Sequence, residues 1–312
     1  MQGDAIVLAF DMGGTRIKVG LVQDGQILAQ EVIDVDARRA DEGPLPTVLE
    51  YVAKYRLIYH LAAIGISIRG IIDPISGVIL DVKGAYEQSI GQPWGQMIAQ
   101  ETGLPTYVEN DARMYTLGEL THGAGRGASN LFCLTLGTGV GCGVVLSNRL
   151  MRGMRSVFGS VAGHITIAKD GPVCNCGNIG CLEALIGTAG LSQQAIERGI
   201  GGIEPQLPPT PYAIFAHARQ GDSAAQALVD WFARTLGAGI VSLIHTYDPD
   251  IVIVGGGIMH SATQFLPAVQ AYVDEHAWTV PRGRVRVLAA QLGDAAALIG
   301  VAELTQRPEL LF

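Results

Sequence analysis

A pattern of apolar strand, glycine turn and apolar strand occurs twice in this chain of 312 residues. The first copy covers residues 5–22 (AIVLAFDMGGTRIKVGLV), and the second covers residues 130–146 (NLFCLTLGTGVGCGVVL). Runs rich in Ile, Val and Leu predict buried strands, and the glycines between them predict tight turns. Two copies of one unit suggest two related halves that face a cleft.

Outside these two copies, strand patterns alternate with helix patterns. The predicted strands lie at 26–33, 62–68, 105–110, 250–258 and 284–290, and the predicted helices lie at 46–61, 93–102, from about 111, 222–247 and 294–305. This alternation predicts an α/β protein in which helices cover mixed sheets.

Composition limits the partners. The chain is 48% hydrophobic and 16% charged, and its formal net charge is -8. Nucleic acids and anionic membranes need a basic face, so neither is expected as a partner. The first apolar run ends at Asp11, far short of the ~20 apolar residues of a membrane span. We therefore predict a cytoplasmic protein, which would have to bind an anionic cofactor locally, through backbone N–H groups and a metal ion.

Three of the five cysteines fall within residues 174–181 (CNCGNIGC), and a histidine lies ten residues before the first of them. Three thiolates and one imidazole complete a tetrahedral zinc site, and a site with four protein ligands is structural. Gly177 and Gly180 would let the chain curl around the ion. The alternative is that these cysteines are ordinary small core residues, as is expected for Cys133 and Cys142. The predicted ligands are His164, Cys174, Cys176 and Cys181.

Three glycine-rich turns are candidates for a nucleotide site: DMGGTRIK (11–18), LGTGVGCG (136–143) and VGGG (254–257). Phosphates need close approach of the backbone and N–H groups that point at oxygen, and glycine permits both. The chain contains neither a P-loop nor a Rossmann fingerprint. Asp11 ends a strand beside the first turn, where it would either position Mg²⁺ through water or simply cap the turn.

The segment ENDARMYTLGE (109–119) places Asn110 and Asp111 at a predicted strand-to-helix junction. A carboxylate at a helix start interacts favourably with the helix dipole, so Asp111 fits a plain N-cap. It fits equally well a base that takes the proton of a substrate hydroxyl during phosphoryl transfer. The spacing alone leaves both interpretations open.

Together these motifs resemble the ROK family (repressors, open reading frames, kinases) from Asp11 to the last helix. CNCGNIGCLE (174–183) matches the family pattern C-x-C-G-x-x-G-C-x-E at every fixed position, and His164, within AGHI, has the family's spacing. DMGGTRIKVG and LGTGVGCG resemble its two phosphate motifs, VIVGGGI its adenosine motif and ENDA its substrate motif.

The resemblance implies two actin-like (ribonuclease H-like) domains with an active-site cleft between them. The smaller N-terminal domain would comprise residues 1–121 plus about 292–312. The larger domain, residues 122–291, would carry the zinc site and the surface of a homodimer.

The resemblance also implies an ATP- and Mg²⁺-dependent kinase that phosphorylates a hydroxyl, the 6-OH, of a hexose or N-acetylhexosamine of the glucose or N-acetylmannosamine type. Asp111 would be the catalytic base, and the zinc would orient sugar-binding groups. The expected sugar contacts are Gly70, Asn110, Asp111, His164 and Glu183. The expected cofactor contacts are Asp11, Gly13, Gly14, Thr15, Lys18, Gly137, Thr138, Gly139, Gly255, Gly256 and Gly257.

The chain departs from the family pattern around the expected sugar. Val161 stands where many members have Glu, Arg69 stands where Pro is common, and the segment 82–95 lacks the usual Asn, for which Glu87 or Gln88 would substitute. An apolar Val161 would face the acyl methyl of an N-acetylhexosamine. The alternative is that it only packs and the sugar is another hexose.

Two other functions fit the family: a catalytically inactive sugar-binding protein and a sugar-responsive transcriptional regulator. The intact phosphate motifs and Asp111 argue against the first. Only ten residues precede Asp11, too few for a helix-turn-helix domain, which argues against the second.

Overall fold

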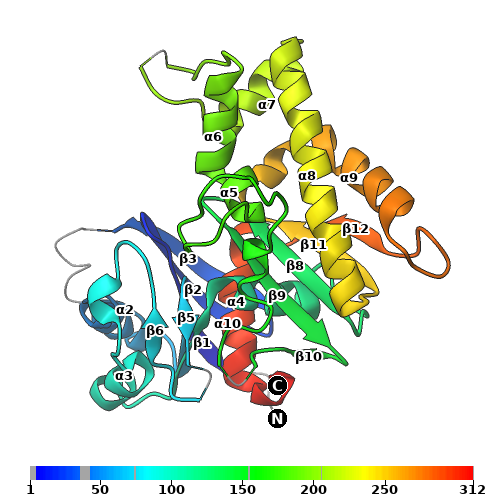
Figure 1. Ribbon diagram of the computed structural model, residues 1–312. Coiled ribbons are helices and arrows are strands. Elements are labelled where there is room, and N and C mark those ends of the chain that lie inside the picture. The colour runs from blue at the N-terminus through cyan, green and yellow to red at the C-terminus, as the bar shows by residue number, and fades with distance from the viewer. Residues whose placement is uncertain (1–4, 36–42, 74, 154, 205, 312) are drawn as a thin grey trace. The chain divides into compact units, whose positions relative to one another are not determined.

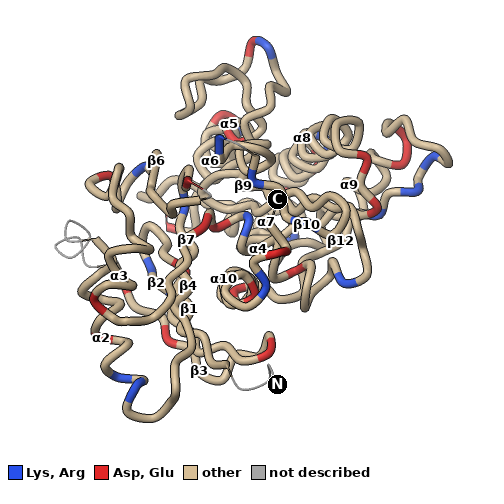
Figure 2. The backbone as a smooth tube through the Cα atoms, turned by 90° about the horizontal axis from the view of Figure 1, so that it is seen from below, with Lys and Arg blue, Asp and Glu red and all other residues tan. Residues whose placement is uncertain are grey.

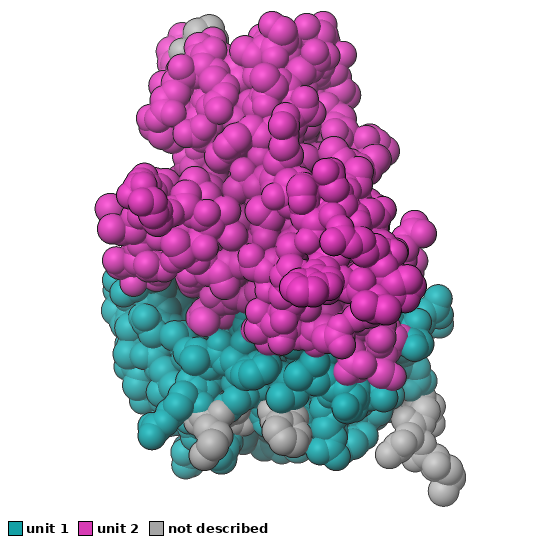
Figure 3. All heavy atoms as spheres, turned by 45° about the vertical axis from the view of Figure 1, so that its right-hand side comes forward, with its two compact units in different colours: residues 1–127, 143–160, 294–312 teal, residues 128–142, 161–293 magenta. Residues whose placement is uncertain are grey.

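The computed structural model describes residues 5–35, 43–73, 75–153, 155–204 and 206–311 as an α/β protein (Figure 1). The chain divides into two compact units, coloured separately in Figure 3. Unit 1 comprises residues 1–127, 143–160 and 294–312, and unit 2 comprises residues 128–142 and 161–293. The division expected from the sequence differs mainly at 143–160, which it assigned to the larger domain.

Unit 1 is built on a five-stranded sheet with the order β3-β2-β1-β4-β7. The first three strands form an antiparallel meander, and β4 and β7 are added parallel to β1. A two-stranded hairpin, β5-β6, follows β4. The strands are β1 (Ile6–Met12), β2 (Arg16–Gln23), β3 (Gln26–Asp34), β4 (Leu61–Ile68), β5 (Ile71–Ile72), β6 (Ile79–Asp81) and β7 (Thr106–Asn110).

Helices cover both faces of this sheet, with α2 and α3 on one face and α4 and α10 on the other (Figures 1 and 2). Strands β1 and β4 are almost wholly buried because they are covered on both sides. The helices are α2 (Leu45–Arg56), α3 (Trp94–Thr102), α4 (Asp111–His122) and α10 (Ala296–Gln306), with short 3₁₀ turns η1 (Glu87–Ser89) and η5 (Pro308–Leu310).

Helices α4 and α10 touch backbone to backbone through glycine. A Cβ atom at Gly300 would lie 1.8 Å from the carbonyl oxygen of Met114, and one at Gly118 would lie 2.1 Å from that of Ala296. No side chain fits at either position. The close crossing fixes the start of α4, and therefore Asp111, against the helix that covers the sheet.

Gly300→Ala is expected to destabilise unit 1, because the added methyl group must push two packed helices apart. We expect a loss of about 2–3 kcal/mol in the free energy of unfolding, typical of overpacking in a core. Chemical denaturation of the purified variant measures it. Gly201→Ala is the matched control, since a Cβ at Gly201 meets no atom within 4 Å. Equal stability of the two variants would contradict the close-contact interpretation.

The second sheet has the order β10-β9-β8-β11-β12. In unit 2, β11 pairs in parallel with both β8 and β12. The boundary between the units passes through β9, and β10 belongs to unit 1. The strands are β8 (Leu131–Leu136), β9 (Val140–Leu146), β10 (Arg149–Leu150), β11 (Ile251–Gly255) and β12 (Arg286–Ala289).

Unit 2 is rich in helices, which pack around α8. The α-helices are α5 (Leu182–Ile186), α6 (Thr188–Glu197), α7 (Pro211–Arg219), α8 (Ser223–Tyr247) and α9 (Ala262–His276). The 3₁₀ turns are η2 (Ala162–His164), η3 (Gly257–Ser261) and η4 (Gly293–Ala295), the last of which crosses the boundary between the units.

Among the described helices, α8 alone is long and apolar enough to cross a membrane by length and composition. Its most apolar window is 56% buried within the protein, as is common for the central helix of a soluble domain. Contacts with α5, α6, α7 and α9 account for this burial. The predicted core character of 222–247 is confirmed.

Both predicted strand–glycine turn–strand units are confirmed, as β1–β2 and β8–β9. The helix predicted at 46–61 is α2, which ends at Arg56, five residues earlier than expected. Leu57 and Ile58 are exposed, and Leu61 begins β4. An apolar run alone therefore does not distinguish the end of a helix from the loop and strand that follow it.

Candidate active site

The carboxyl ends of β1, β4 and β7 form one edge of the unit 1 sheet. The strands are parallel, and their register places Asp11 opposite Ser67, and Ser67 opposite Glu109. One residue further, Met12, Ile68 and Asn110 are aligned. Because parallel strands end at the same edge, residues nearly 100 positions apart in the sequence are brought together.

Asp11 lies in a small charged network at this edge. Its Oδ1 accepts a hydrogen bond from Ser67 Oγ at 3.2 Å, and its Oδ2 lies 3.6 Å from Lys18 Nζ. Lys18 also pairs with Asp294 at 2.8 Å. Burial raises the pKa of Asp11, while Lys18 and Ser67 oppose that shift. Its carboxylate thus faces a cation and a hydroxyl group at the strand edge.

Asn110, and not Asp111, caps helix α4. Asn110 Oδ1 accepts from the backbone N–H of Arg113 at 3.1 Å, and its Nδ2 donates to the Gly70 carbonyl at 2.9 Å. Asp111 is the first helical residue, and its Oδ1 accepts from Ala112 N–H at 2.8 Å and from Asn110 Nδ2 at 3.1 Å. The interpretation of Asp111 as a plain N-cap is therefore wrong, because its neighbour performs that task.

The ionisation of Asp111 is strongly perturbed. Burial, followed by the negative charge of Asp11, raises the pKa of Asp111 to about 6. The Ala112 N–H group and the Arg69 guanidinium oppose this shift. A carboxylate with a pKa near 6 is ionised at neutral pH and is a stronger proton acceptor than an ordinary Asp, as general-base catalysis requires.

The first glycine turn and Gly70 have little space for side chains. A Cβ at Gly13 would lie 2.5 Å from the Arg16 carbonyl oxygen. Gly70 has a φ of +127°, and a Cβ there would lie 2.4 Å from the Asp81 carbonyl oxygen. Gly14 and Thr15 continue the turn into β2, where Lys18 lies. Positions 13 and 70 therefore require glycine for steric reasons, whether or not they bind a ligand.

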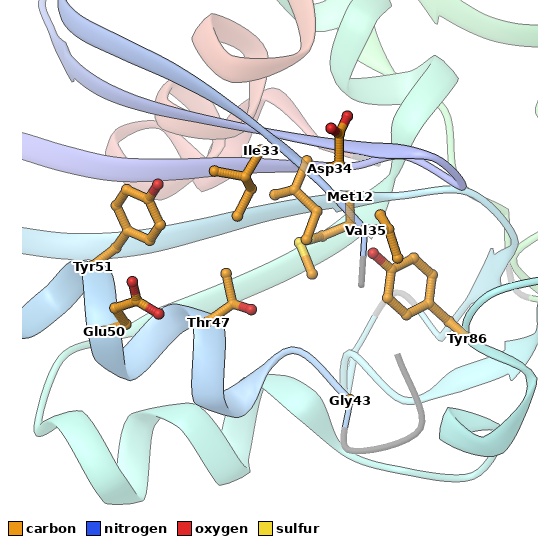
Figure 4. Close-up of a pocket in the computed structure, with 10 residues that line it drawn as sticks. Met12, Ile33, Asp34, Val35, Gly43, Thr47, Glu50, Tyr51 and Tyr86 are labelled. Atoms are coloured by element: carbon orange, nitrogen blue, oxygen red, sulfur yellow. The ribbon is translucent and has the colours of Figure 1, made fainter. Parts of the chain in front are cut away.

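A cavity of about 260 Å³ opens in unit 1 between the end of β3 and helix α2 (Figure 4). Thr47, Glu50 and Tyr51 of α2 line it opposite Ile33 and Asp34. It contains none of the residues predicted to bind sugar or nucleotide. It adjoins the first glycine turn through Met12 and Ile17, which flank the turn, and through Tyr86, whose hydroxyl donates to the Gly13 carbonyl at 3.4 Å.

A second cavity, of about 300 Å³, lies in unit 2 and brings two predicted motifs together. Gly137 and Thr138 from the second glycine turn and Gly257 from the third line it. The third turn reaches this place because Gly256 has a φ of +91° and packs against Leu136 at the end of β8. Leu136 and Ile258, from the same two motifs, also line it. The other lining residues, which sequence reasoning missed, are Ile186, Thr188, Leu191, Thr210, Pro211, Tyr212, Phe215, His260 and Ser261.

This second cavity has a mostly apolar lining with a few hydroxyl side chains, the usual composition of a small-molecule pocket. Gly255 ends β11 immediately before the turn. The sequence did hold a signal for two of these lining residues: Thr210-Pro211 is a typical helix start, and Thr210 does cap α7.

His164 and the three clustered cysteines converge in unit 2. Their ligand atoms all lie within 4.8 Å of one another. His164 Nδ1 is 3.4 Å from Cys174 Sγ, and the sulfurs of Cys176 and Cys181 are 3.7 Å apart. With Zn–S near 2.3 Å and Zn–N near 2.05 Å, a tetrahedral site has edges of about 3.6 Å for N···S and about 3.8 Å for S···S. The residues therefore fit a zinc ion.

The chain around the cluster folds as the glycine positions predict. Gly177 and Gly180 both have positive φ, and a Cβ at Gly180 would lie 1.6 Å from the Ala168 carbonyl oxygen. Asn178 donates to Cys181 Sγ at 3.4 Å and to Thr166 Oγ1 at 3.0 Å. Such contacts outside the ligand set orient metal ligands.

Purified protein is expected to contain about one zinc per chain, measured by elemental analysis. Cys176→Ser should lower both zinc content and the thermal transition temperature, because the loop loses a cross-link that also stabilises the fold. Cys142→Ser is the control for losing a thiol outside the cluster, since Cys142 lies in β9. Metal-free wild-type protein of unchanged stability would contradict the zinc prediction.

Departures from the family pattern have clear local structures. Val161 is 37% exposed, so it does not simply pack into the core. Glu87 accepts from the Gly84 N–H at 2.8 Å and so caps its own loop. The guanidinium of Arg69 lies beside Gly14, where a Cβ would be 3.3 Å from its Nη2. Arg69 thus adds a positive charge near the first glycine turn.

Comparison with known proteins identifies one family across nearly the whole chain. Residues 7–308 match the ROK family. A glucokinase from Thermotoga maritima is 30% identical over 307 residues, which are 96% of each protein. The bifunctional enzyme NanE/NanK of Brucella melitensis is 31% identical over 96% of this chain and 53% of its own length. Xylose repressors from Caldicellulosiruptor are also among the relatives.

A solved structure of similar architecture is the ROK family glucokinase from Streptomyces griseus in complex with glucose and AMPPNP. It is 32% identical, with a TM-score of 0.82 over 96% of this chain and 99% of that chain. Fold and relatives together define a sugar kinase, a phosphotransferase with an alcohol acceptor, built on the actin-like ATPase fold. The chain belongs to the ROK family.

Proposed function

We propose that this chain transfers the terminal phosphate of ATP to the 6-OH of a hexose or N-acetylhexosamine, with Asp111 as the base. The observation that carries the proposal is the placement of Asp111 at the carboxyl edge of the unit 1 sheet, with its pKa raised to about 6. Asn110 holds one carboxylate oxygen by a hydrogen bond at 3.1 Å. The ionised carboxylate accepts the proton as the hydroxyl attacks.

We propose that the sugar contacts are those that the family resemblance implies: Gly70, Asn110, Asp111, His164 and Glu183. The position of His164 supports two roles at once. Its Nδ1 faces the cysteine sulfurs, so a metal held there leaves Nε2, on the other edge of the ring, for a sugar hydroxyl. Carboxylate, amide and imidazole groups together match the donors and acceptors of adjacent hydroxyls.

The nucleotide is proposed to bind with its base in the 300 Å³ cavity of unit 2 and its phosphates at the glycine turns. Asp11 would hold Mg²⁺ through water, and Lys18 would meet a phosphate oxygen. Mg²⁺ bound to phosphates supplies neutralisation of the charge that develops during transfer. Both Asp11 and Lys18 lie at the edge that carries Asp111.

For the sugar we propose an N-acetylhexosamine, because Val161 offers an exposed apolar surface where many ROK glucokinases carry Glu. The NanE/NanK relative supports this choice, and the glucokinase relatives support glucose as the competing substrate. A homodimer and a cytoplasmic location remain predictions.

A coupled ADP-release assay over hexoses and N-acetylhexosamines tests the proposal. N-acetylmannosamine is expected to give the highest kcat/KM, and Val161→Glu should shift preference toward glucose, because a carboxylate can bind two hydroxyls. A preference for glucose by the wild type would overturn the substrate choice alone. No sugar-dependent ADP from a folded, zinc-loaded sample would favour the inactive sugar-binding protein.

A further inference from the structure

Glu183 of α5 and Thr188 at the start of α6 both form hydrogen bonds with the second glycine turn. Glu183 Oε2 accepts from the backbone N–H of Val140 at 2.9 Å. At the other end, Thr188 donates to the Gly137 carbonyl from its N–H at 3.1 Å and from its Oγ1 at 2.9 Å. A Cβ at Gly139 would lie 2.3 Å from Glu183 Oε2, so the carboxylate rests directly on the turn.

The same carboxylate also lies close to the cluster formed by His164 and the three cysteines. Glu183 Oε1 is 3.9 Å from both His164 Nδ1 and Cys174 Sγ. Cys181 lies two residues earlier in the chain, and the intervening Leu182 donates its N–H to the Ile165 carbonyl at 3.0 Å. One short segment therefore contacts predicted metal ligands on one side and a predicted phosphate-binding turn on the other.

We propose that Glu183 is a positioning residue for the nucleotide-binding turn, and that a metal in the His164/cysteine cluster tightens nucleotide binding through it. The proposal rests on the proposed function in one respect, that the turn at 137–139 binds nucleotide. It extends the expected role of the cluster beyond holding sugar-binding groups.

The physical basis is the ordering of a loop. Residues 165–181 contain many turns, and a metal that joins His164 to three cysteines closes that loop and removes much of its conformational freedom. Helix α5 begins directly after the last ligand, so the ordered loop fixes where Glu183 meets Val140. A turn that is already ordered loses less entropy when phosphate binds.

Calorimetric titration with ADP and Mg²⁺ tests this in the full-length protein, both zinc-loaded and stripped with a chelator. Glu183→Ala is expected to raise the Kd for ADP about tenfold. Glu183→Gln should stay within threefold, since its amide oxygen still accepts from Val140. The control is Glu197→Ala, in which an exposed carboxylate at the end of α6 is removed and no change is expected.

Stripping the metal should raise the Kd for ADP about tenfold in the wild type. In Glu183→Ala it should raise the Kd little further, because both changes break the same connection between the His164/cysteine cluster and the turn at 137–139. Hydrogen exchange gives a second readout that needs no ligand: the Val140 amide should exchange faster in Glu183→Ala and in stripped protein.

The proposal is overturned if Glu183→Ala binds ADP within twofold of the wild type, if stripping acts equally on both proteins, or if Val140 exchange is unchanged. If zinc-loaded wild-type protein binds no ADP, the proposed nucleotide site itself is wrong, and this proposal, which depends on that site, is wrong as well. Sugar turnover is measured separately, so a failure of the substrate choice leaves the test intact.

Discussion

Asp111→Asn is expected to lower kcat for sugar phosphorylation by about a thousandfold, within the range for loss of a general base. The amide keeps the size and the hydrogen bonds of the side chain but cannot take a proton. The KM values for ATP and sugar should change little, because the fold around Asn110 is preserved. Steady-state kinetics measure the effect, and a variant that retains a tenth of wild-type kcat would remove Asp111 from the role of base.

The same substitution is expected to stabilise the protein above pH 6. The pKa of Asp111 is about 6 in the folded protein, above its ordinary value of 3.8. Below pH 3.8 the carboxyl group is protonated in both the folded and the unfolded protein and does not change the free energy of unfolding. As the pH rises toward 6, the unfolded chain ionises first, so the free energy of unfolding falls and then stays low.

Removing this cost should raise the free energy of unfolding by roughly 2 kcal/mol at pH 8, since each pKa unit is worth about 1.4 kcal/mol and partial exposure screens some of it. Thermal unfolding at pH 8 and pH 4 measures the difference, which should shrink at pH 4. Asp230→Asn, at an exposed position of α8, is the control. An equal or lower stability at pH 8 would contradict the raised pKa.

Wild-type activity should follow the same titration. The kcat/KM is expected to fall below about pH 6, because the protonated carboxyl group cannot accept the hydroxyl proton. Arg69→Ala should move this acidic limb to higher pH, since the Arg69 guanidinium opposes the rise in the pKa of Asp111. If kcat/KM of Arg69→Ala falls at the same pH as in the wild type, the Arg69 guanidinium does not influence the pKa of the base.

Arg113→Met is expected to lower the free energy of unfolding by about 3–5 kcal/mol, the usual cost of removing one partner of a buried ion pair. Arg113 is completely buried in the first turn of α4, and its Nη1 pairs with Glu109 at 3.1 Å. Its Nη2 donates to the carbonyl oxygens of Arg152 (3.0 Å), Ser156 (2.7 Å) and Phe158 (3.2 Å). The variant leaves these acceptors without that donor.

Chemical denaturation of Arg113→Met measures this loss, with Arg126→Met as the control at an exposed position just after α4. Adding Glu109→Gln to Arg113→Met should recover part of the stability, because the buried carboxylate is then neutral. A loss of less than 1 kcal/mol in the single variant would mean that the guanidinium contributes little by binding the carbonyl groups of Arg152, Ser156 and Phe158.

Much of this protein follows from local sequence patterns. The strand–glycine turn–strand units, the core helix α8 and the convergence of His164 with the cysteines were all predictable. Each depends on short-range chemistry: an apolar run forms a buried strand, and ligands close in sequence need only a few turns to meet. The cluster of His164 with the three cysteines is the clearest case, because Gly177 and Gly180 supply the required backbone conformations.

Only the tertiary structure decided which distant residues meet. The parallel register of β1, β4 and β7 places Ser67 beside Asp11 and Asn110 beside Ile68. The contact between Glu183 and Val140 likewise joins segments 43 residues apart. Strand pairing and helix packing set these neighbours, and both depend on the whole fold, so no local pattern encodes them. The sequence determined the chemical groups, and the packing determined their environment, including the burial that raises the pKa of Asp111.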